Sequence, residues 1–259
     1  KDKFLIESIG LSLANDNNER YTSVDLLNIN AVKTYCENCE NFNTIIFLVG
    51  RAHKSKNNNF TIYNNINYIT LKNLLNCLKE YNKTPEKIIF ASTISVYGEK
   101  LNKNLYLEED LEEPYSPYAI TKLKAENYLL KNFGNKAWIL RFAPVYYKQF
   151  QLNLKSRTKV GNLFFKIGGG HKNLSLCNIQ NINLVILKII EDIIPFGKYN
   201  ISDNKVYNYN DLLIYQNAQF VLNIPSFFIL IIYYVSGFFK FNRIKENSIK
   251  LISDNIFSS

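Results

Sequence analysis

Two runs of almost uninterrupted apolar residues constrain the fold of this chain more than any other feature. Residues 45–49 and 88–92 are nearly all apolar, as in strands that are covered on both faces within a parallel sheet. Segments of strand and helix character alternate around them, so the sequence predicts an α/β fold with a doubly wound parallel sheet. We expect strands over 4–9, 22–26, 43–49, 87–93 and 136–142, and helices over 28–40, 61–82, 115–133 and 180–193.

Composition and charge narrow the class of protein. With 259 residues and 47% hydrophobic content, the chain can bury a full core. Its 31 Lys and Arg residues against 22 Asp and Glu residues give a net charge of +9. Because the basic residues are scattered, we expect an anionic small ligand rather than a nucleic acid. Four cysteines predict neither a disulfide framework nor a metal site, and a reducing, cytoplasmic location fits them.

The pair Tyr118 and Lys122 suggests proton-transfer chemistry. Residues four apart lie on the same face of a helix, and an ammonium beside a phenol lowers the phenol's pKa. A hydroxyl from Thr93, at the end of a preceding strand, would complete a proton-transfer group at a substrate C–OH. Spacing alone also fits an exposed helical pair, so the flanking residues have to decide.

Those flanking residues resemble a known family. The motifs are Phe90-Ala91-Ser92-Thr93 with Val96-Tyr97-Gly98, then Glu108-Glu109-Asp110, then Pro114, Ser116-Pro117-Tyr118, Lys122 and Glu126. Together they resemble the extended short-chain dehydrogenase/reductases, and within them the NAD-dependent nucleotide-sugar epimerase/dehydratase group. The resemblance runs from about residue 4 to the C-terminus and is strongest over 87–146.

The resemblance implies roles for individual residues. It implies catalysis by Thr93, Tyr118 and Lys122, with Tyr118 as the acid/base and Lys122 as the residue that lowers its pKa and holds the nicotinamide ribose. It also implies NAD or NADP as the cofactor and a nucleotide-diphosphate sugar as the substrate, which Thr93 and Tyr118 would contact. Arg157 is a candidate for the substrate diphosphate by charge. The cofactor contacts would be Asp25, Leu26, Leu48, Val49, Gly50, Lys122, Phe142 and Ala143. For Asp25, a structural role in a turn or helix cap stays open.

The glycine pattern departs from that family. A Rossmann-like fold binds dinucleotide through a Gly-rich turn after its first strand, yet neither G-x-G-x-x-G nor G-x-x-G-x-x-G occurs in the sequence. We therefore expect the segment at 4–9 to be the family's second strand, with the first strand and Gly-rich loop upstream of Lys1. We expect a cofactor domain over 1–148 and about 176–202. A small, mostly helical substrate domain would then comprise 149–175 and 203–259, and we expect 149–179 to be an irregular basic insertion.

The residues after Thr93 bear on the type of reaction. The resemblance implies that 4,6-dehydratases carry an acidic pair there, whereas this chain has Ile94 and Ser95, which cannot ionise for that work. We therefore expect an epimerase or a 4-keto reductase, and disfavour a dehydratase. A non-catalytic Rossmann-like binding protein, or an inactive fragment without the cofactor loop, is the alternative.

One apolar segment raises the question of a membrane. From Leu212 to Phe239 there is no charged residue, but the strongly apolar part covers only about 13 residues, whereas about 20 are needed for a span. We expect a buried helix or a dimer face, and disfavour both a membrane span and association of 225–241 with a membrane surface. The resemblance implies a homodimer.

Overall fold

A four-stranded parallel sheet forms the centre of the molecule. The computed structural model describes residues 7–10, 21–52, 59–239 and 241–258. The strand order is β12 (Gly197–Ile201), β6 (Ala137–Phe142), β4 (Lys87–Thr93) and β3 (Thr44–Phe47). All three pairings are parallel, which confirms the predicted sheet.

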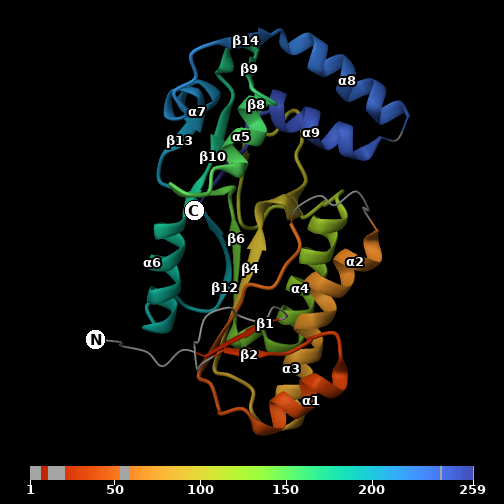
Figure 1. Cartoon of the computed structure of the whole chain (residues 1–259), viewed down its shortest axis with the longest axis vertical. Helices are drawn as coiled ribbons and strands as arrows, with labels where there is room; N and C mark the ends of the chain where they lie inside the picture. The colour runs from red at the N-terminus through yellow and green to blue at the C-terminus, as the bar shows by residue number, and fades with distance from the viewer. Residues whose placement is uncertain (1–6, 11–20, 53–58, 240, 259) are drawn as a thin grey trace.

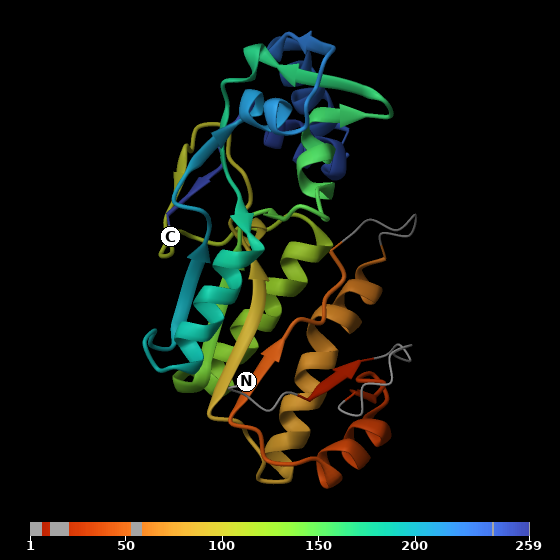
Figure 2. The ribbon, with the colours of Figure 1, turned by 60° about the vertical axis from the view of Figure 1, so that its left-hand side comes forward.

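Helices cover both faces of this sheet (Figures 1 and 2). On one face lie α1 (Ile29–Asn38), α3 (Thr70–Glu80) and α4 (Pro117–Phe133), and on the other lies α6 (Ile179–Ile190). Successive residues of β4 point to opposite faces, as in any strand. Ile88 and Phe90 join the core under α3 and α4, whereas Ile89 joins the core under α6. The uninterrupted apolar run in this strand therefore serves two cores, as the sequence indicates.

The N-terminal strands form a separate ribbon. Strand β1 (Ser8–Gly10) pairs in parallel with β2 (Tyr21–Ser23), and within the described residues neither is hydrogen-bonded to β3. Residues 4–6 of the strand expected at 4–9 lie outside the described residues. The expected upstream strand and Gly-rich loop remain a prediction.

The predicted helix over 61–82 has three successive parts. These are α2 (Phe60–Asn64), a π-helical turn η1 (Asn65–Ile69) and α3. A π-helical turn widens the helix by one residue, and such turns are frequent at functional sites. This turn carries Asn67, which is fully buried.

The segment 149–179 is not irregular, so that prediction was wrong. It contains α5 (Leu152–Thr158), β8 (Lys159–Val160), β9 (Leu163–Ile167), β10 (Asn173–Ser175) and β11 (Cys177–Asn178). Strands β9, β10 and β11 pair with β14 (Val221–Ile224), β13 (Val206–Asn208) and β7 (Val145–Tyr146). Because most of these partner strands are distant in sequence, no local sequence pattern predicts them.

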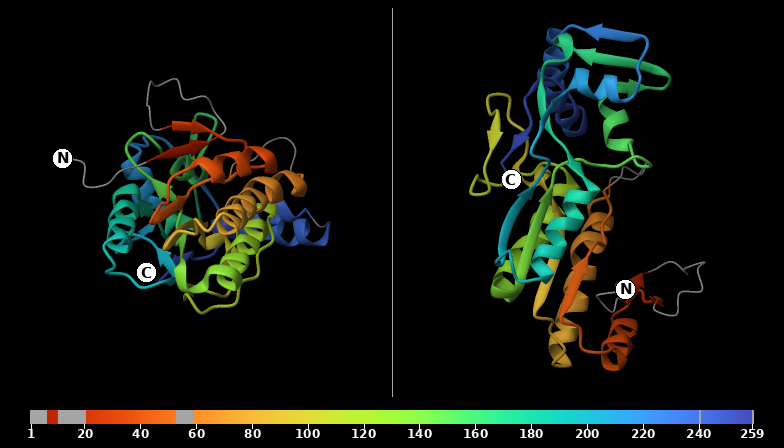
Figure 3. Two further views of the ribbon diagram at one scale, coloured as in Figure 1. Left: turned by 90° about the horizontal axis from the view of Figure 1, so that it is seen from below. Right: turned by 90° about the vertical axis from the view of Figure 1, so that its left-hand side faces the viewer.

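The C-terminal part lies at one end of the elongated molecule (Figure 3). It contains α7 (Tyr209–Tyr215), α8 (Ser226–Phe238), α9 (Asn242–Ile252) and β15 (Ile256–Phe257), the last paired with β5 (Leu105–Tyr106). This arrangement supports the division at 148/149 and 202/203, which we retain as a proposal. No helix in the described part of the chain has both the length and the hydropathy to cross a membrane.

Candidate active site

Thr93 lies where β4 ends and the chain turns into a 3-10 helix, η2 (Ile94–Tyr97). Its hydroxyl accepts a hydrogen bond from the backbone N–H of Ser95 at 3.2 Å, which caps the turn. Gly98 ends this turn with a φ of +63°. A Cβ at Gly98 would lie 2.2 Å from the carbonyl oxygen of Glu113, so glycine is required there. The turn thus holds the Thr93 hydroxyl at the carboxyl end of the sheet.

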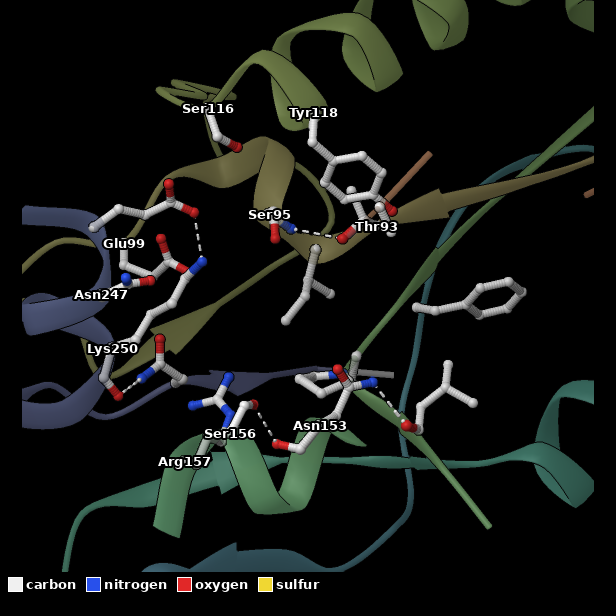
Figure 4. A pocket seen from close by; sticks show the side chains of 18 of the residues that line it. Thr93, Ser95, Glu99, Ser116, Tyr118, Asn153, Ser156, Arg157, Asn247 and Lys250 are labelled. Carbon is white, nitrogen blue, oxygen red and sulfur yellow. Dashed lines mark hydrogen bonds and ion pairs between the residues drawn. The ribbon is translucent and has the colours of Figure 1, made fainter. Parts of the chain in front are cut away.

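Tyr118 reaches Thr93 from the first turn of α4. Ser116 caps this helix by accepting from the backbone N–H of Ala119, and Pro117 occupies the first turn. The Tyr118 phenol lies beside the Thr93 hydroxyl, and the two side chains face each other in Figure 4. Burial raises the pKa of Tyr118, while the Thr93 hydroxyl and the charge of Lys250 act in the lowering direction.

Lys122 is buried behind this pair. Its ammonium donates to the carbonyl oxygen of Ala91 at 2.8 Å and lies 4.6 Å from the centre of the Phe90 ring. Burial lowers the pKa of Lys122 to about 8, against the opposing charge of Glu126. The expectation that Lys122 lowers the Tyr118 pKa is not met in this arrangement. The reason is that the Lys122 side chain turns toward β4, and the cation that acts on the phenol is Lys250.

The loop after β3 meets Lys122 at Gly50. A Cβ at Gly50 would lie 3.0 Å from the Lys122 ammonium nitrogen, so glycine keeps the backbone close to that charge. Asn67 fixes this loop: its Oδ1 accepts from the backbone N–H of Arg51 at 2.7 Å, and its Nδ2 donates to Thr121 at 3.0 Å. The loop, η1 and α4 are thereby tied together around Lys122.

Four predicted cofactor contacts lie before α1 or directly after β3. Leu48 is 66% exposed, whereas Val49 is partly buried against the core under α3 and α4. Leu26 is buried in that same core, and the exposed Asp25 accepts from the backbone N–H of Leu27 at 2.9 Å. Asp25 therefore has a structural role in a turn. Asn28, not Asp25, caps α1.

A buried ionic network supports the site from beneath. Arg141 on β6 is fully buried and lies 2.6 Å from Glu126 and 2.5 Å from Glu112. It also donates to the Tyr97 hydroxyl at 2.9 Å, and Ser92 donates to Glu126. The carboxylates raise the pKa of Arg141, so its charge is permanent. These contacts join the ends of β4 and β6 to α4, the elements that carry Thr93 and Tyr118.

Thr93 and Tyr118 line a cavity of about 1050 Å³. Three of the other predicted residues, Phe142, Ala143 and Arg157, line the same cavity. The Nη1 atom of Arg157 is buried and has no hydrogen-bond partner. Among the described residues, five predicted site residues therefore line one cavity. Lys122, Leu48, Val49 and Gly50 do not line it.

An ion-pair cluster that the sequence does not indicate also lines the cavity. Lys250 on α9 lies 3.4 Å from Glu99 and 2.6 Å from Glu246, and all three line the cavity (Figure 4). The two carboxylates raise the pKa of Lys250. Glu99 and Lys250 are about 150 positions apart in the chain, so only the folded structure brings them together.

A sequence model of the NAD dependent epimerase/dehydratase family matches residues 7–177, which is more than half of the chain. The chain belongs to this family. The motifs from Thr93 to Glu126 and three strands of the parallel sheet, β3, β4 and β6, fall within the matched region, whereas β12 lies beyond it.

Individual members of the family are similar over different spans. An uncharacterized UDP-glucose epimerase of Bacillus subtilis, YtcB, is 39% identical over 98 residues, which are 37% of this chain and 30% of that protein. The aligned region thus spans less than a third of this curated relative.

Solved structures of the family share the fold. UDP-glucose 4-epimerase of Thermotoga maritima, solved with UDP-glucose, superposes with a TM-score of 0.64 at 19% identity, over 85% of this chain and 78% of that one. UDP-glucuronic acid 4-epimerase of Bacillus cereus, in complex with NAD, gives 0.60 at 23% identity, over 80% and 70%. A 4,6-dehydratase and a dehydrorhamnose reductase have similar TM-scores. The fold is therefore shared by enzymes of several reaction types.

Proposed function

We propose that this protein is an NAD(P)-dependent enzyme that epimerises a nucleotide-diphosphate sugar or reduces its 4-keto form. The observation that carries the proposal is that Thr93 and Tyr118 lie side by side on the lining of a large cavity. Lys122 lies one helical turn beyond Tyr118, with its ammonium buried against β4 and Gly50. Membership of the NAD dependent epimerase/dehydratase family supports this assignment.

In this proposal the Tyr118 phenol supplies and removes the proton. Because burial raises its pKa, the phenol is protonated at neutral pH and can donate to a sugar ketone oxygen as the carbonyl carbon gains a hydride. In the reverse direction the sugar hydroxyl loses its proton to Tyr118 and its carbon loses a hydride. Thr93 holds the substrate oxygen within reach of the phenol. The charge of Lys250 acts on Tyr118 in the direction that eases its ionisation.

The residues present fit one end of a nicotinamide dinucleotide. The cofactor, when bound, accepts or returns the hydride. Gly50 leaves space beside the Lys122 ammonium that a Cβ would fill, and an ammonium there can donate to ribose hydroxyls. For the pyrophosphate, the sequence offers no Gly-rich turn. The fit therefore covers the ribose and nicotinamide end.

The substrate diphosphate would bind at Arg157. A buried guanidinium nitrogen without a partner gains most from an anionic acceptor, because leaving a buried donor unpaired costs free energy. A nucleotide-diphosphate sugar has the charge and the size for this cavity. The epimerases of similar fold act, by name, on UDP-glucose and UDP-glucuronic acid.

The proposal still disfavours a dehydratase, although the reasons now come from the residues that line the cavity. Ile94 and Ser95 line the cavity and cannot ionise for elimination. Two carboxylates, Glu99 and Glu246, do reach the cavity, but both are paired with Lys250. A carboxylate held in an ion pair is a weak base for removing a sugar proton.

A non-catalytic binding protein is the second candidate. It is favoured by the lack of a Gly-rich turn in the sequence and by a Tyr118 pKa that is raised rather than lowered. Binding of a nucleotide sugar without turnover would support this alternative, whatever the cofactor concentration.

The test is turnover by Tyr118→Phe, compared with turnover by the wild-type protein. UDP-glucose, UDP-glucuronic acid and a 4-keto sugar nucleotide are offered with NAD or NADPH, and the products are identified by NMR. Tyr128→Phe is the matched control, because that phenol lies on the same helix and bonds to Asn76 instead. We expect loss of turnover only in Tyr118→Phe. Equal turnover by both variants would refute the proposed role.

A further inference from the structure

Helix α8 exposes a large apolar surface. Eight apolar side chains of this 13-residue helix are between 38% and 81% exposed. They are Phe227, Phe228, Leu230, Ile231, Ile232, Tyr234, Val235 and Phe238. Exposed apolar residues that occur singly need no explanation, but a contiguous patch indicates an interaction surface.

This surface extends around more than half of the helix. Of the described elements, only α9 packs extensively against α8, and the two helices project together from the C-terminal part (Figure 1). Ser236 is the one fully buried residue of α8. At 100° per residue, the exposed apolar side chains span an arc of about 200°. A single packed neighbour covers a stripe of only about 100°. The width of the arc therefore favours a surrounding apolar medium over one partner helix.

The charged residues next to α8 in the sequence indicate what kind of apolar medium would surround this helix. No charged residue occurs between Leu212 and Phe239, and the next charged positions in the sequence are Lys240, Arg243 and Lys245, before the first acid, Glu246. Lys245 is exposed, and its ammonium lies 5.3 Å from the centre of the Tyr233 ring. An apolar helix beside basic residues is typical of segments that bind in the interface of anionic membranes.

We propose that α8 lies in the interface of a membrane that contains anionic lipids, with its exposed side chains among the acyl chains. At about 1.5 Å per residue the helix is roughly 20 Å long, too short for a hydrocarbon core of about 30 Å. It would therefore lie along the membrane plane instead of crossing it. The inference does not depend on the proposed catalytic activity.

The test is co-sedimentation of the purified chain with vesicles of phosphatidylcholine, either alone or with about 30% phosphatidylserine. The variant combines Phe228→Ser, Ile231→Ser and Phe238→Ser. Its matched control combines Leu111→Ser, Ile193→Ser and Phe196→Ser, which are equally exposed elsewhere on the protein. We expect binding to the anionic vesicles, with the α8 variant weakened at least about 100-fold and the control unchanged. Single changes at Ile231 and Phe238, checked by circular dichroism, replace the triple variant if it does not fold.

Three results would overturn the inference. The first is no binding to anionic vesicles, and the second is equal loss in the control variant. The third is a dimer in sedimentation velocity that the α8 changes abolish, without vesicle binding, since that would assign the surface to a second copy of the chain. Binding to phosphatidylcholine alone, as strong as to the anionic vesicles, would refute the role of the basic residues.

Discussion

Removing the buried charge of Arg141 is the perturbation whose cost the structure defines best. Arg141 and Glu126 are both fully buried and lie 2.6 Å apart. Breaking a buried ion pair by deleting one partner costs about 3–5 kcal/mol, because the other charge is left uncompensated. For Arg141→Met we therefore expect a loss of about 3–5 kcal/mol at neutral pH. In a protein of this size that corresponds to a fall in Tm of roughly 6–20 °C.

The loss should depend on pH in a defined direction. Without Arg141, burial raises the pKa of Glu126 in the folded state above its unfolded value of about 4.3. The folded state then binds more protons than the unfolded state between these two values, so stability falls as pH rises through that window. The slope is at most about 1.4 kcal/mol per pH unit. The variant should therefore regain stability on acidification, relative to the wild-type protein.

Urea unfolding followed by circular dichroism, at about pH 5.5 and about pH 7.5, measures both effects. Lys33→Met is the control, because Lys33 and Glu80 form an exposed ion pair worth at most about 1 kcal/mol. Adding Glu126→Leu to Arg141→Met should restore much of the loss, since no unpaired charge then remains. A loss below about 1 kcal/mol, or one that does not change with pH, would refute the reasoning.

Three further predictions concern the site. Gly98→Ala should cost at least about 2 kcal/mol, because its Cβ would meet the Glu113 carbonyl oxygen and its φ is positive; a Tm within experimental error of wild type would contradict this. If the charged Lys122 ammonium is required, activity should fall above about pH 8, where Lys122 loses its proton. Lys122→Arg should shift this fall in activity to higher pH, and an unchanged pH profile would contradict the role. Arg157→Gln should raise the KM for the nucleotide sugar by roughly tenfold with kcat nearly unchanged, and an unaltered KM would assign the diphosphate elsewhere.

Local sequence patterns were sufficient for three of the four strands of the central sheet, β3, β4 and β6, but not for β12, and the motifs around Thr93 and Tyr118 were sufficient to single out that pair. The continuous apolar run at 88–92 predicts a strand buried on both faces, and β4 contributes to two cores. Ser116 before Pro117 predicts the start of α4 within about one turn. These features depend on neighbouring residues, so a single chain is enough to identify them.

The remaining features depend on contacts between distant residues. Strand β10 pairs with β13, although about 30 positions separate them. The same holds for Lys250, which reaches the cavity from α9. Helical spacing correctly put Lys122 one turn from Tyr118, but it could not predict that the ammonium would bond to Ala91. Side-chain direction depends on the available acceptors, which the spacing does not specify.

The central claim is that Thr93 and Tyr118 move a proton to or from a sugar oxygen while a hydride moves at its carbon. Stopped-flow absorbance of reduced nicotinamide, after mixing the protein with cofactor and nucleotide sugar, follows that step directly. In Tyr118→Phe the rate of hydride transfer should fall at least about 100-fold, with nucleotide-sugar affinity changed less than about threefold. Hydride transfer at the wild-type rate in this variant would contradict the account.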